Sequence, residues 1–215
     1  MAPIRPPGRQ PHRPAREDVS TIAAQPRPAT GSSSTSSRRS EAARLAVLNA
    51  ADDLLMEHGF EALTIEGIAA AAGVAKQTIY RWWKSKVDIL FDNLVLDATP
   101  ALAWPEAPST PADLRAYVHR FAVFLGEEPA GRVLQALLGH AQLDARTAEL
   151  LHTGFLDELR TRDVAHTRAC LAVSADEAAV VLDTLLAPLY HRALVLRRPL
   201  DRAFVDALLD QHLKG

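Results

Sequence analysis

Residues 64–86, TIEGIAAAAGVAKQTIYRWWKSK, contain two short helical patterns on either side of a glycine. Thr64 is a suitable N-cap for the first helix, and Gly73 is a natural stop because glycine adopts the left-handed conformation without a steric penalty. The residues after this turn predict a second short helix. The small side chains of Ala69 and Ala72 would let the two helices pack closely, so the stretch predicts a helix-turn-helix.

Amphipathic helices are expected on both sides of this pattern. In the preceding segment, apolar residues at helical spacing predict a helix over about residues 41–58, with Ser40 as its N-cap and Gly59 as its stop. In the following segment, Ser85 and Asp88 have the spacing of a capping box, and apolar residues again recur at helical spacing. Four helices in succession therefore begin the folded part of the chain.

The remainder of the chain also reads as helical. Four prolines in residues 97–113 indicate a linker or an irregular loop, and capping boxes at Thr110 and Ser174 begin two later helices. The helix after Ser174 is apolar on nearly all faces, which predicts that a second subunit covers part of it, and Pro188 should kink it. Further helices are expected near residues 130–142, near 145–171 and from about Asp201.

The overall composition supports an all-α fold, because Ala and Leu are abundant and runs of β-branched residues are scarce. The single cysteine, Cys170, excludes an intrachain disulfide and a cage of thiolates around a metal. The chain lacks the apolar region of a secretory signal, and no apolar run reaches the ~18 residues of a membrane span. We expect a cytoplasmic protein with no cofactor, no metal site and no membrane partner.

Residues 1–39 are rich in Pro, Arg, Ser and Thr and hold seven Arg against Glu17 and Asp18. Such a composition cannot bury enough apolar surface to offset the entropy cost of ordering, so it predicts a disordered tail. Two interpretations stay open for this tail. It is either a solvated segment or a basic arm that adds non-specific attraction to phosphates.

Charge is distributed unevenly along the chain, whose net charge as a whole is −2. Residues 40–99 hold five Lys and Arg against nine Asp and Glu, yet residues 67–87 contain no acid at all. The charged residues of that short stretch are all cations: Lys76, Arg81, Lys84 and Lys86. A helix that enters the major groove of DNA lies between rows of phosphates, which attract cations and repel acids. The local cationic patch therefore indicates a nucleic-acid contact.

Residues 44–90, RLAVLNAADDLLMEHGFEALTIEGIAAAAGVAKQTIYRWWKSKVDIL, closely resemble the DNA-binding domain of the TetR/AcrR family of bacterial transcription regulators. The matching features are the Ala-Ala helix, Gly59-Phe60, Leu63-Thr64, Ile68-Ala69, Ala72-Gly73-Val74, Thr78-Ile79-Tyr80, Trp83 and Lys86. Residues 185–209 resemble the final helices of one C-terminal subtype. The resemblance implies an all-α homodimer that binds double-stranded operator DNA, usually as a repressor that a small organic effector releases.

On this interpretation the chain divides into the tail (1–39), a helix-turn-helix DNA-binding domain (40–96) and a helical effector-binding and dimerisation domain (97–215). Lys76 and Gln77 are the expected base readers, because Lys suits guanine O6/N7 and Gln suits adenine N6/N7. The residues expected to hold the DNA backbone are Thr64, Thr78, Tyr80, Trp82 and Lys86, of which Lys86 is the phosphate contact that the resemblance implies. Tyr80 and both tryptophans could instead be core residues; we expect Trp83 in the core and Trp82 exposed.

Effector and dimer contacts are expected in the C-terminal domain. The candidate effector residues are Trp104, Tyr117, His119, Phe121, Phe124, His140, Phe155 and Tyr190, although aromatic residues at helical spacing equally suit a core. The candidate dimer residues lie on the last two helices: Leu182, Leu185, Leu186, Leu189, Ala193, Leu194, Phe204 and Leu208.

Two other classes of protein were weighed against a DNA-binding regulator. An enzyme is disfavoured, because the chain contains no G-x-G-x-x-G, P-loop, G-x-S-x-G or metal-binding motif. A helical protein–protein adaptor without sequence-specific DNA binding is the alternative. The regulator should bind a specific duplex with an affinity that falls steeply as salt rises, because a DNA-binding protein releases counterions that are condensed on the DNA. A protein–protein adaptor should not.

Overall fold

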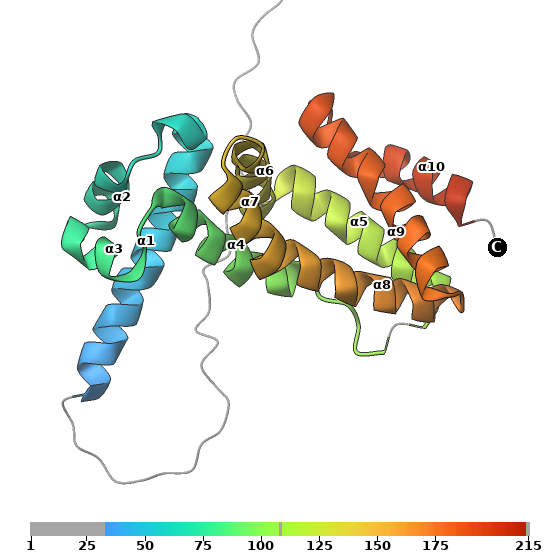
Figure 1. Ribbon diagram of the computed structural model, residues 1–215, viewed down its shortest axis with the longest axis horizontal. Coiled ribbons are helices and arrows are strands. Elements are labelled where there is room, and N and C mark those ends of the chain that lie inside the picture. Colours follow the sequence, from blue (N-terminus) through green and yellow to red (C-terminus); the bar gives the residue numbers. More distant parts are fainter. Residues whose placement is uncertain (1–32, 108, 214–215) are drawn as a thin grey trace, which may run out of the picture.

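A computed structural model of the chain describes residues 33–107 and 109–213, and every element within these ranges is helical (Figure 1). The N-terminal part comprises α1 (Ser33–Ala62), α2 (Ile65–Ala72), α3 (Lys76–Trp82) and α4 (Lys86–Ala101). We call α1, α2 and α3 the head. Residues 1–32 of the predicted tail lie outside the described residues. The helix α1 begins at Ser33, so residues 33–39 are helical, and the prediction of a disordered tail was wrong for them.

The predicted caps of α2 and α4 are present, whereas Ser40, the predicted N-cap of the first helix, lies inside α1, which begins at Ser33. The Thr64 hydroxyl accepts a hydrogen bond from the Gly67 amide at 3.0 Å, and Gly73 ends α2 with a φ of 66°. Ser85 caps α4 by accepting from the Asp88 amide. Gly59 has a φ of 77°, but the chain kinks there and helical structure resumes up to the end of α1. The helix-turn-helix prediction is confirmed.

The C-terminal part is a helical bundle. Its elements are α5 (Pro111–Glu127), α6 (Pro129–Ala141), α7 (Ala145–Leu151), the π-helical turn η1 (His152–Leu156), α8 (Asp157–Leu171), α9 (Ala175–Tyr190), the π-helical turn η2 (His191–Val195) and α10 (Arg202–His212). The predicted capping boxes are present at the starts of α5 and α9. Pro188 lies inside α9, and the wide turn η2 begins three residues after it.

The helix α4 joins the two parts (Figure 1). It continues to Ala101 with Pro100 inside it, so helical structure crosses the predicted boundary at residue 97 and the expected linker is shorter than residues 97–113. The helix packs against α1 of the head and against α6 of the bundle. Its apolar side chains belong to a single continuous core that runs from Leu48 and Ile79 in the head to Phe121 and Leu125 in α5.

The predicted long helix over residues 145–171 contains the turn η1. The wide π turn brings the backbone of Gly154 against the ring of Phe91 in α4, where a Cβ on Gly154 would lie 2.6 Å from Phe91 Cζ. Any larger residue at this position would require the Phe91 ring to move. The sequence pattern did not reveal the turn, because an inserted π turn leaves the apolar spacing almost helical.

Two glycines of α6 provide a matched test of the packing between α5 and α6. A Cβ on Gly131 would lie 1.8 Å from the Phe124 carbonyl oxygen, whereas a Cβ on Gly139 would meet nothing within 4 Å. We expect Gly131→Ala to destabilise the fold by about 3 kcal/mol or more, because backbone atoms must separate. Gly139→Ala should be neutral or stabilising by up to about 1 kcal/mol, because alanine is the better helix former. Urea unfolding of both variants measures this, and equal effects would contradict the tight crossing.

Candidate nucleic-acid interface and ligand cavity

The helix α3 is anchored by one face and exposes the other. Ile79 and Trp83, four residues apart, are buried in the core. Lys76 and Gln77 are exposed at the start of the helix, and Tyr80 is 53% exposed. The helix lies at the outer edge of the head together with α2 (Figure 1). This arrangement presents a row of donors on a helix whose opposite face is fixed by packing.

The two tryptophans differ in their surroundings. Trp83 is buried as predicted, and its Nε1 donates to Asp92 Oδ2 at 2.8 Å, an oxygen that Arg44 also reaches at 2.9 Å. Trp82 is half-buried, with its ring edge-on to Trp83 at 5.4 Å and the Arg81 guanidinium 5.0 Å from its centre. Trp82 is therefore less exposed than the helical facing predicted, because its ring packs on its neighbour.

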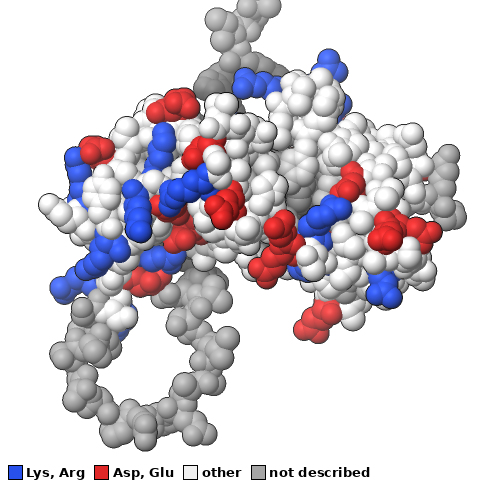
Figure 2. Space-filling view, viewed as in Figure 1, with Lys and Arg blue, Asp and Glu red and all other residues white. Residues whose placement is uncertain are grey.

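Both lysines predicted to contact DNA have partners within the protein. Lys76 Nζ lies 2.7 Å from Glu66 Oε1. Lys86 Nζ donates to the Phe60 carbonyl oxygen at 2.6 Å and lies 4.2 Å from the centre of the Phe60 ring. Lys86 thus satisfies a carbonyl near the end of α1, a structural role that the sequence did not indicate. Across the head, Lys and Arg side chains gather with Asp and Glu between them (Figure 2).

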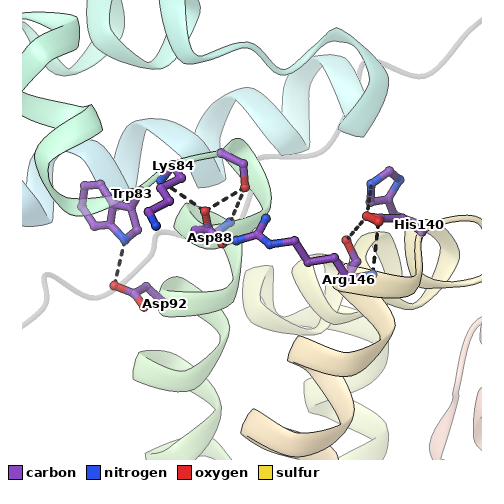
Figure 3. A network of polar contacts seen from close by, with 9 residues as sticks. Trp83, Lys84, Asp88, Asp92, His140 and Arg146 are labelled. Atoms are coloured by element: carbon purple, nitrogen blue, oxygen red, sulfur yellow. Dashed lines mark hydrogen bonds and ion pairs between the residues drawn. The ribbon is translucent and has the colours of Figure 1, made fainter.

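A polar network ties the start of α4 to the C-terminal bundle (Figure 3). The Asp88 carboxylate accepts from Ser85 Oγ at 2.9 Å and from the Lys84 amide at 3.1 Å, so it completes the α4 cap. The same carboxylate accepts from Arg146 of α7 at 2.7 Å. Asp88 was predicted as a cap, but its bond to Arg146 depends on tertiary packing and has no local sequence pattern. The bond fixes α7 against the junction between α3 and α4.

A cavity of about 1300 Å³ lies between the end of α1 and the bundle helices α6, α8 and α9. Its walls are mainly apolar, and the head supplies part of them through Leu55, Met56 and Phe60. The polar and charged residues at the wall are Arg132, Gln135, Gln142, His152, Asp157, Arg160, Asp163, Asp183, Arg197 and Arg198. A molecule in this cavity would contact α1 directly, so the head and the cavity share a wall.

Two of the eight predicted effector residues line this cavity, namely Phe121 and Tyr190. Tyr117, Phe124 and Phe155 are buried in the core instead, and Trp104 stacks on Tyr117 with ring centres 4.1 Å apart. His119 bonds Asp206 of α10 at 2.8 Å, and His140 packs on Phe60 with ring centres 4.7 Å apart. These six residues do not line this cavity, because helical spacing does not distinguish a packed core from a cavity wall, and a role for them in effector binding stays a prediction.

A buried carboxylate organises the aromatic residues beside the cavity. Asp163 is buried and accepts from Trp104 Nε1 at 2.9 Å, from Arg162 Nη2 at 2.9 Å and from the Tyr117 hydroxyl. Burial, reinforced by the charge of Asp163, raises the pKa of Tyr117 above its usual value, so the phenol keeps its proton and donates. Burial also raises the pKa of Tyr190. Both phenols are therefore stabilised in the neutral form.

The predicted dimer residues are divided between the protomer interior and its surface. Leu182, Leu185, Leu189 and Leu208 are buried within the protomer, so the prediction that they contact a partner was wrong. Leu186, Ala193 and Leu194 line the cavity, and Phe204 lies under the Arg192 guanidinium at 4.3 Å. The exposed large apolar side chains of this region are Val180 at 65%, Leu194 at 36%, Val195 at 69% and Leu196 at 47%, so Leu194 is the one predicted dimer residue among them.

The segment Ala175–Val195, which combines α9 and η2, is long and apolar enough to cross a membrane by length and composition alone. Its mean hydropathy is 1.3, and 22% of it is buried. A single helix of this kind is weak support for a membrane span, because core and interface helices have the same composition. Among the described residues, no group of three or more His, Cys, Asp or Glu could hold a metal ion.

Two protein-family models match the chain, one over the head and the start of α4 and the other over the C-terminal bundle. Residues 47–92 match the family model of bacterial regulatory proteins of the tetR family, and residues 104–212 match that of the tetracyclin repressor-like C-terminal domain. The chain belongs to the TetR family of transcriptional regulators. The all-α fold with an N-terminal helix-turn-helix and a C-terminal helical domain is thereby confirmed.

Individual relatives of this TetR-family regulator support the assignment. The uncharacterized HTH-type transcriptional regulator YdeS of Bacillus subtilis (strain 168) is 32% identical over 182 residues, which are 82% of this chain and 91% of YdeS. The crystal structure of the TetR family transcription regulator SCO0332 has a TM-score of 0.63 at 33% identity and covers 80% of this chain and 97% of that one. A further similar structure is that of NalD, the secondary repressor of the MexAB-OprM multidrug efflux pump in Pseudomonas aeruginosa. It has a TM-score of 0.60 at 21% sequence identity and covers 82% of this chain and 97% of NalD, which shows a similar fold.

The raised pKa of Tyr190 predicts loss of stability in alkali. The pKa of Tyr190 in the folded protein lies above its unfolded value of 10.0. The contribution of Tyr190 to the unfolding free energy is therefore fully present below about pH 10 and is lost as the pH rises further. Tyr190→Phe removes the titrating group, so its unfolding free energy should fall less between pH 9 and pH 11 than that of the natural chain, by about 1 kcal/mol. Urea unfolding at both pH values measures the difference. The exposed Tyr80→Phe is the control, and an identical response of the two variants would contradict the expectation.

Proposed function

We propose that this TetR-family regulator is a homodimeric repressor that binds operator DNA through α3 and leaves it when a small organic effector enters the cavity. The observation that carries the proposal is the orientation of α3. Burial of Ile79 and Trp83 fixes one face of the helix, and the opposite face offers Lys76, Gln77 and Tyr80 to solvent. A recognition helix needs this combination, because its base-reading side chains must be held in register with the groove.

The contacts with DNA divide by chemistry. Lys76 and Gln77, at the start of α3, read base edges in the major groove. The hydroxyls of Thr64, Thr78 and Tyr80, the indole of Trp82 and the Lys86 ammonium hold the phosphate backbone and set the register. Thr64 is exposed at the start of α2, and Lys86 is half-buried at the start of α4, where its ammonium contacts Phe60, four residues before Thr64.

A second copy of the chain covers the exposed apolar side of α9 and η2. Val180 and Val195 are well exposed in the protomer, and the Ala175–Val195 segment is only 22% buried, as expected of a helix that meets an equivalent helix of its partner. Pairing would place two α3 helices about 34–36 Å apart, one turn of DNA or a multiple of it. This use of the apolar surface also fits a cytoplasmic protein better than contact with a membrane does.

The cavity between the head and the bundle suits a small organic effector that carries polar or charged groups, because its wall combines apolar side chains with arginines and aspartates. Its ligand would touch Met56 and Phe60 of α1, and the Phe60 carbonyl also binds Lys86 at the start of α4. A ligand that binds one arrangement of the heads more tightly than another shifts the population towards that arrangement. We assign no catalytic role to these groups.

Salt-dependent binding tests the DNA interface. A duplex selected from a random pool should bind, and the logarithm of its association constant should fall linearly with the logarithm of the salt concentration. Lys86→Met keeps the apolar stem on Phe60 but removes the charge, so the slope should flatten by about 0.9 for each phosphate that is no longer neutralised. Arg168→Ala, which removes an exposed cation of α8, is the control and should leave the slope unchanged.

Two results would contradict these assignments. Failure to select any duplex would favour a protein–protein adaptor, and an unchanged slope for Lys86→Met would remove Lys86 from the phosphate-binding residues. Light scattering decides the oligomeric state in the same samples, and a chain that stays single in solution would contradict the homodimer.

A cavity-filling variant tests the effector site. Small organic compounds that raise the melting temperature should weaken binding to the selected duplex. Leu159→Trp places an indole at the cavity wall and should lower compound affinity by roughly tenfold or more while DNA affinity is retained. Leu143→Trp, at a residue that is 90% exposed and outside the cavity, is the control. A compound that binds without changing DNA affinity would refute the coupling.

A further inference from the structure

The first residue of α3 is held by an acid from α2. Lys76 Nζ lies 2.7 Å from Glu66 Oε1, and the two side chains are 51% and 58% exposed. The hydrogen bond from Lys76 is the main cause that lowers the pKa of Glu66, so the carboxylate is ionised at neutral pH. Glu66 directly precedes the stretch of residues 67–87 that contains no acid. A negative charge therefore stands at the edge of the surface that faces DNA.

Glu66 lies in the first turn of α2, where an acid favours the helix dipole, but this does not account for its bond to Lys76. An exposed pair of long side chains contributes little to folding, because water screens the attraction and both side chains lose freedom. A carboxylate on a DNA-facing surface also weakens binding to phosphates. Its presence calls for an explanation in terms of what the pair does to Lys76.

The two lysines of the interface have partners of different charge. Lys86 donates to the Phe60 carbonyl oxygen, which is neutral, so Lys86 keeps its full positive charge. Lys76 donates to a carboxylate, so the pair has no net charge and attracts phosphates weakly. A lysine that binds phosphate needs its charge, whereas a lysine that reads a base needs donors in a defined place.

The donors of Lys76 match this second role. A lysine ammonium carries three N–H groups, and the bond to Glu66 uses one of them. Two donors remain, and the major-groove edge of guanine presents two acceptors, N7 and O6. The bond to Glu66 also restricts a flexible side chain that would otherwise reach phosphates in many conformations.

We propose that Glu66 is a specificity-determining residue of the DNA interface, because it cancels the attraction of Lys76 for phosphates and directs the two remaining donors to a guanine. The inference rests on the proposed function, since it requires α3 to lie in the major groove. Glu66 itself is a positioning residue that acts through Lys76. The selected duplex should therefore contain a guanine whose identity depends on Lys76.

The test compares Glu66→Gln with the natural chain on a selected duplex and on a scrambled duplex of the same composition. Glutamine keeps an oxygen that accepts from Lys76 but removes the charge. Binding to the scrambled duplex should become roughly tenfold tighter at about 0.1 M salt, and the salt slope should steepen by about 0.9 per protomer, because Lys76 now releases counterions. The selected duplex should gain less, so the ratio of the two affinities should fall several-fold.

Two further variants separate this role from a general effect of charge. Glu61→Gln removes an exposed acid from the end of α1 and should change the ratio little. When Lys76 is already replaced by Met, Glu66→Gln should change the ratio of the two affinities much less, because no lysine remains whose charge Glu66 could cancel. Equal effects of Glu66→Gln and Glu61→Gln, or an undiminished effect in the Lys76→Met background, would overturn the proposal.

The same measurements distinguish this inference from the proposed function. If the natural chain binds no duplex in a salt-dependent way, the proposed function fails. If the natural chain binds a selected duplex but Glu66→Gln leaves the affinity ratio unchanged, only the role of Glu66 fails. Thermal melting of all variants verifies that they fold.

Discussion

The continuous apolar core that passes through α4 is the constraint on which the rest of this structure depends. The helix buries Val87, Leu90 and Leu94 and packs on α1 at one side and on α6 at the other. Each large side chain that is removed from water contributes about 1.5–3 kcal/mol, so neither part can shift freely against the other. The orientation of α3, the walls of the cavity and the contact between Arg146 and Asp88 all follow from this shared packing.

That packing places two kinds of chemistry close together. The Phe60 side chain lines the cavity, and its carbonyl oxygen binds Lys86 at the start of α4. The ring of His140, from α6, packs against Phe60 on another side. The cavity and the Lys86 ammonium are therefore separated by a single residue.

The electrostatics of the head are more selective than its composition indicates. The stretch without acids is a local feature of the sequence, but folding adds Glu66 beside Lys76 and the Phe60 carbonyl beside Lys86. Cations on a DNA-binding surface are therefore not equivalent, because the partner of each decides how much charge reaches the phosphates. The buried carboxylate of Asp163 is similarly paired, with Trp104, Tyr117 and Arg162.

The sequence by itself determined the helices, most of their caps, the helix-turn-helix and the exposed start of α3, because each depends on spacing within a few residues. Thr64, Gly73, Ser85, Thr110 and Ser174 all occupy the cap positions that their neighbours predict. Only the tertiary structure decided which aromatic residues line the cavity, which leucines of α9 are buried in the protomer, and which partners Lys76, Lys86 and Asp88 find. Helical periodicity identifies an apolar face but not what covers it, and a bond between residues far apart in the chain has no local pattern. The physical reason is that these features arise from the packing of one helix on another, which depends on the whole arrangement of the core.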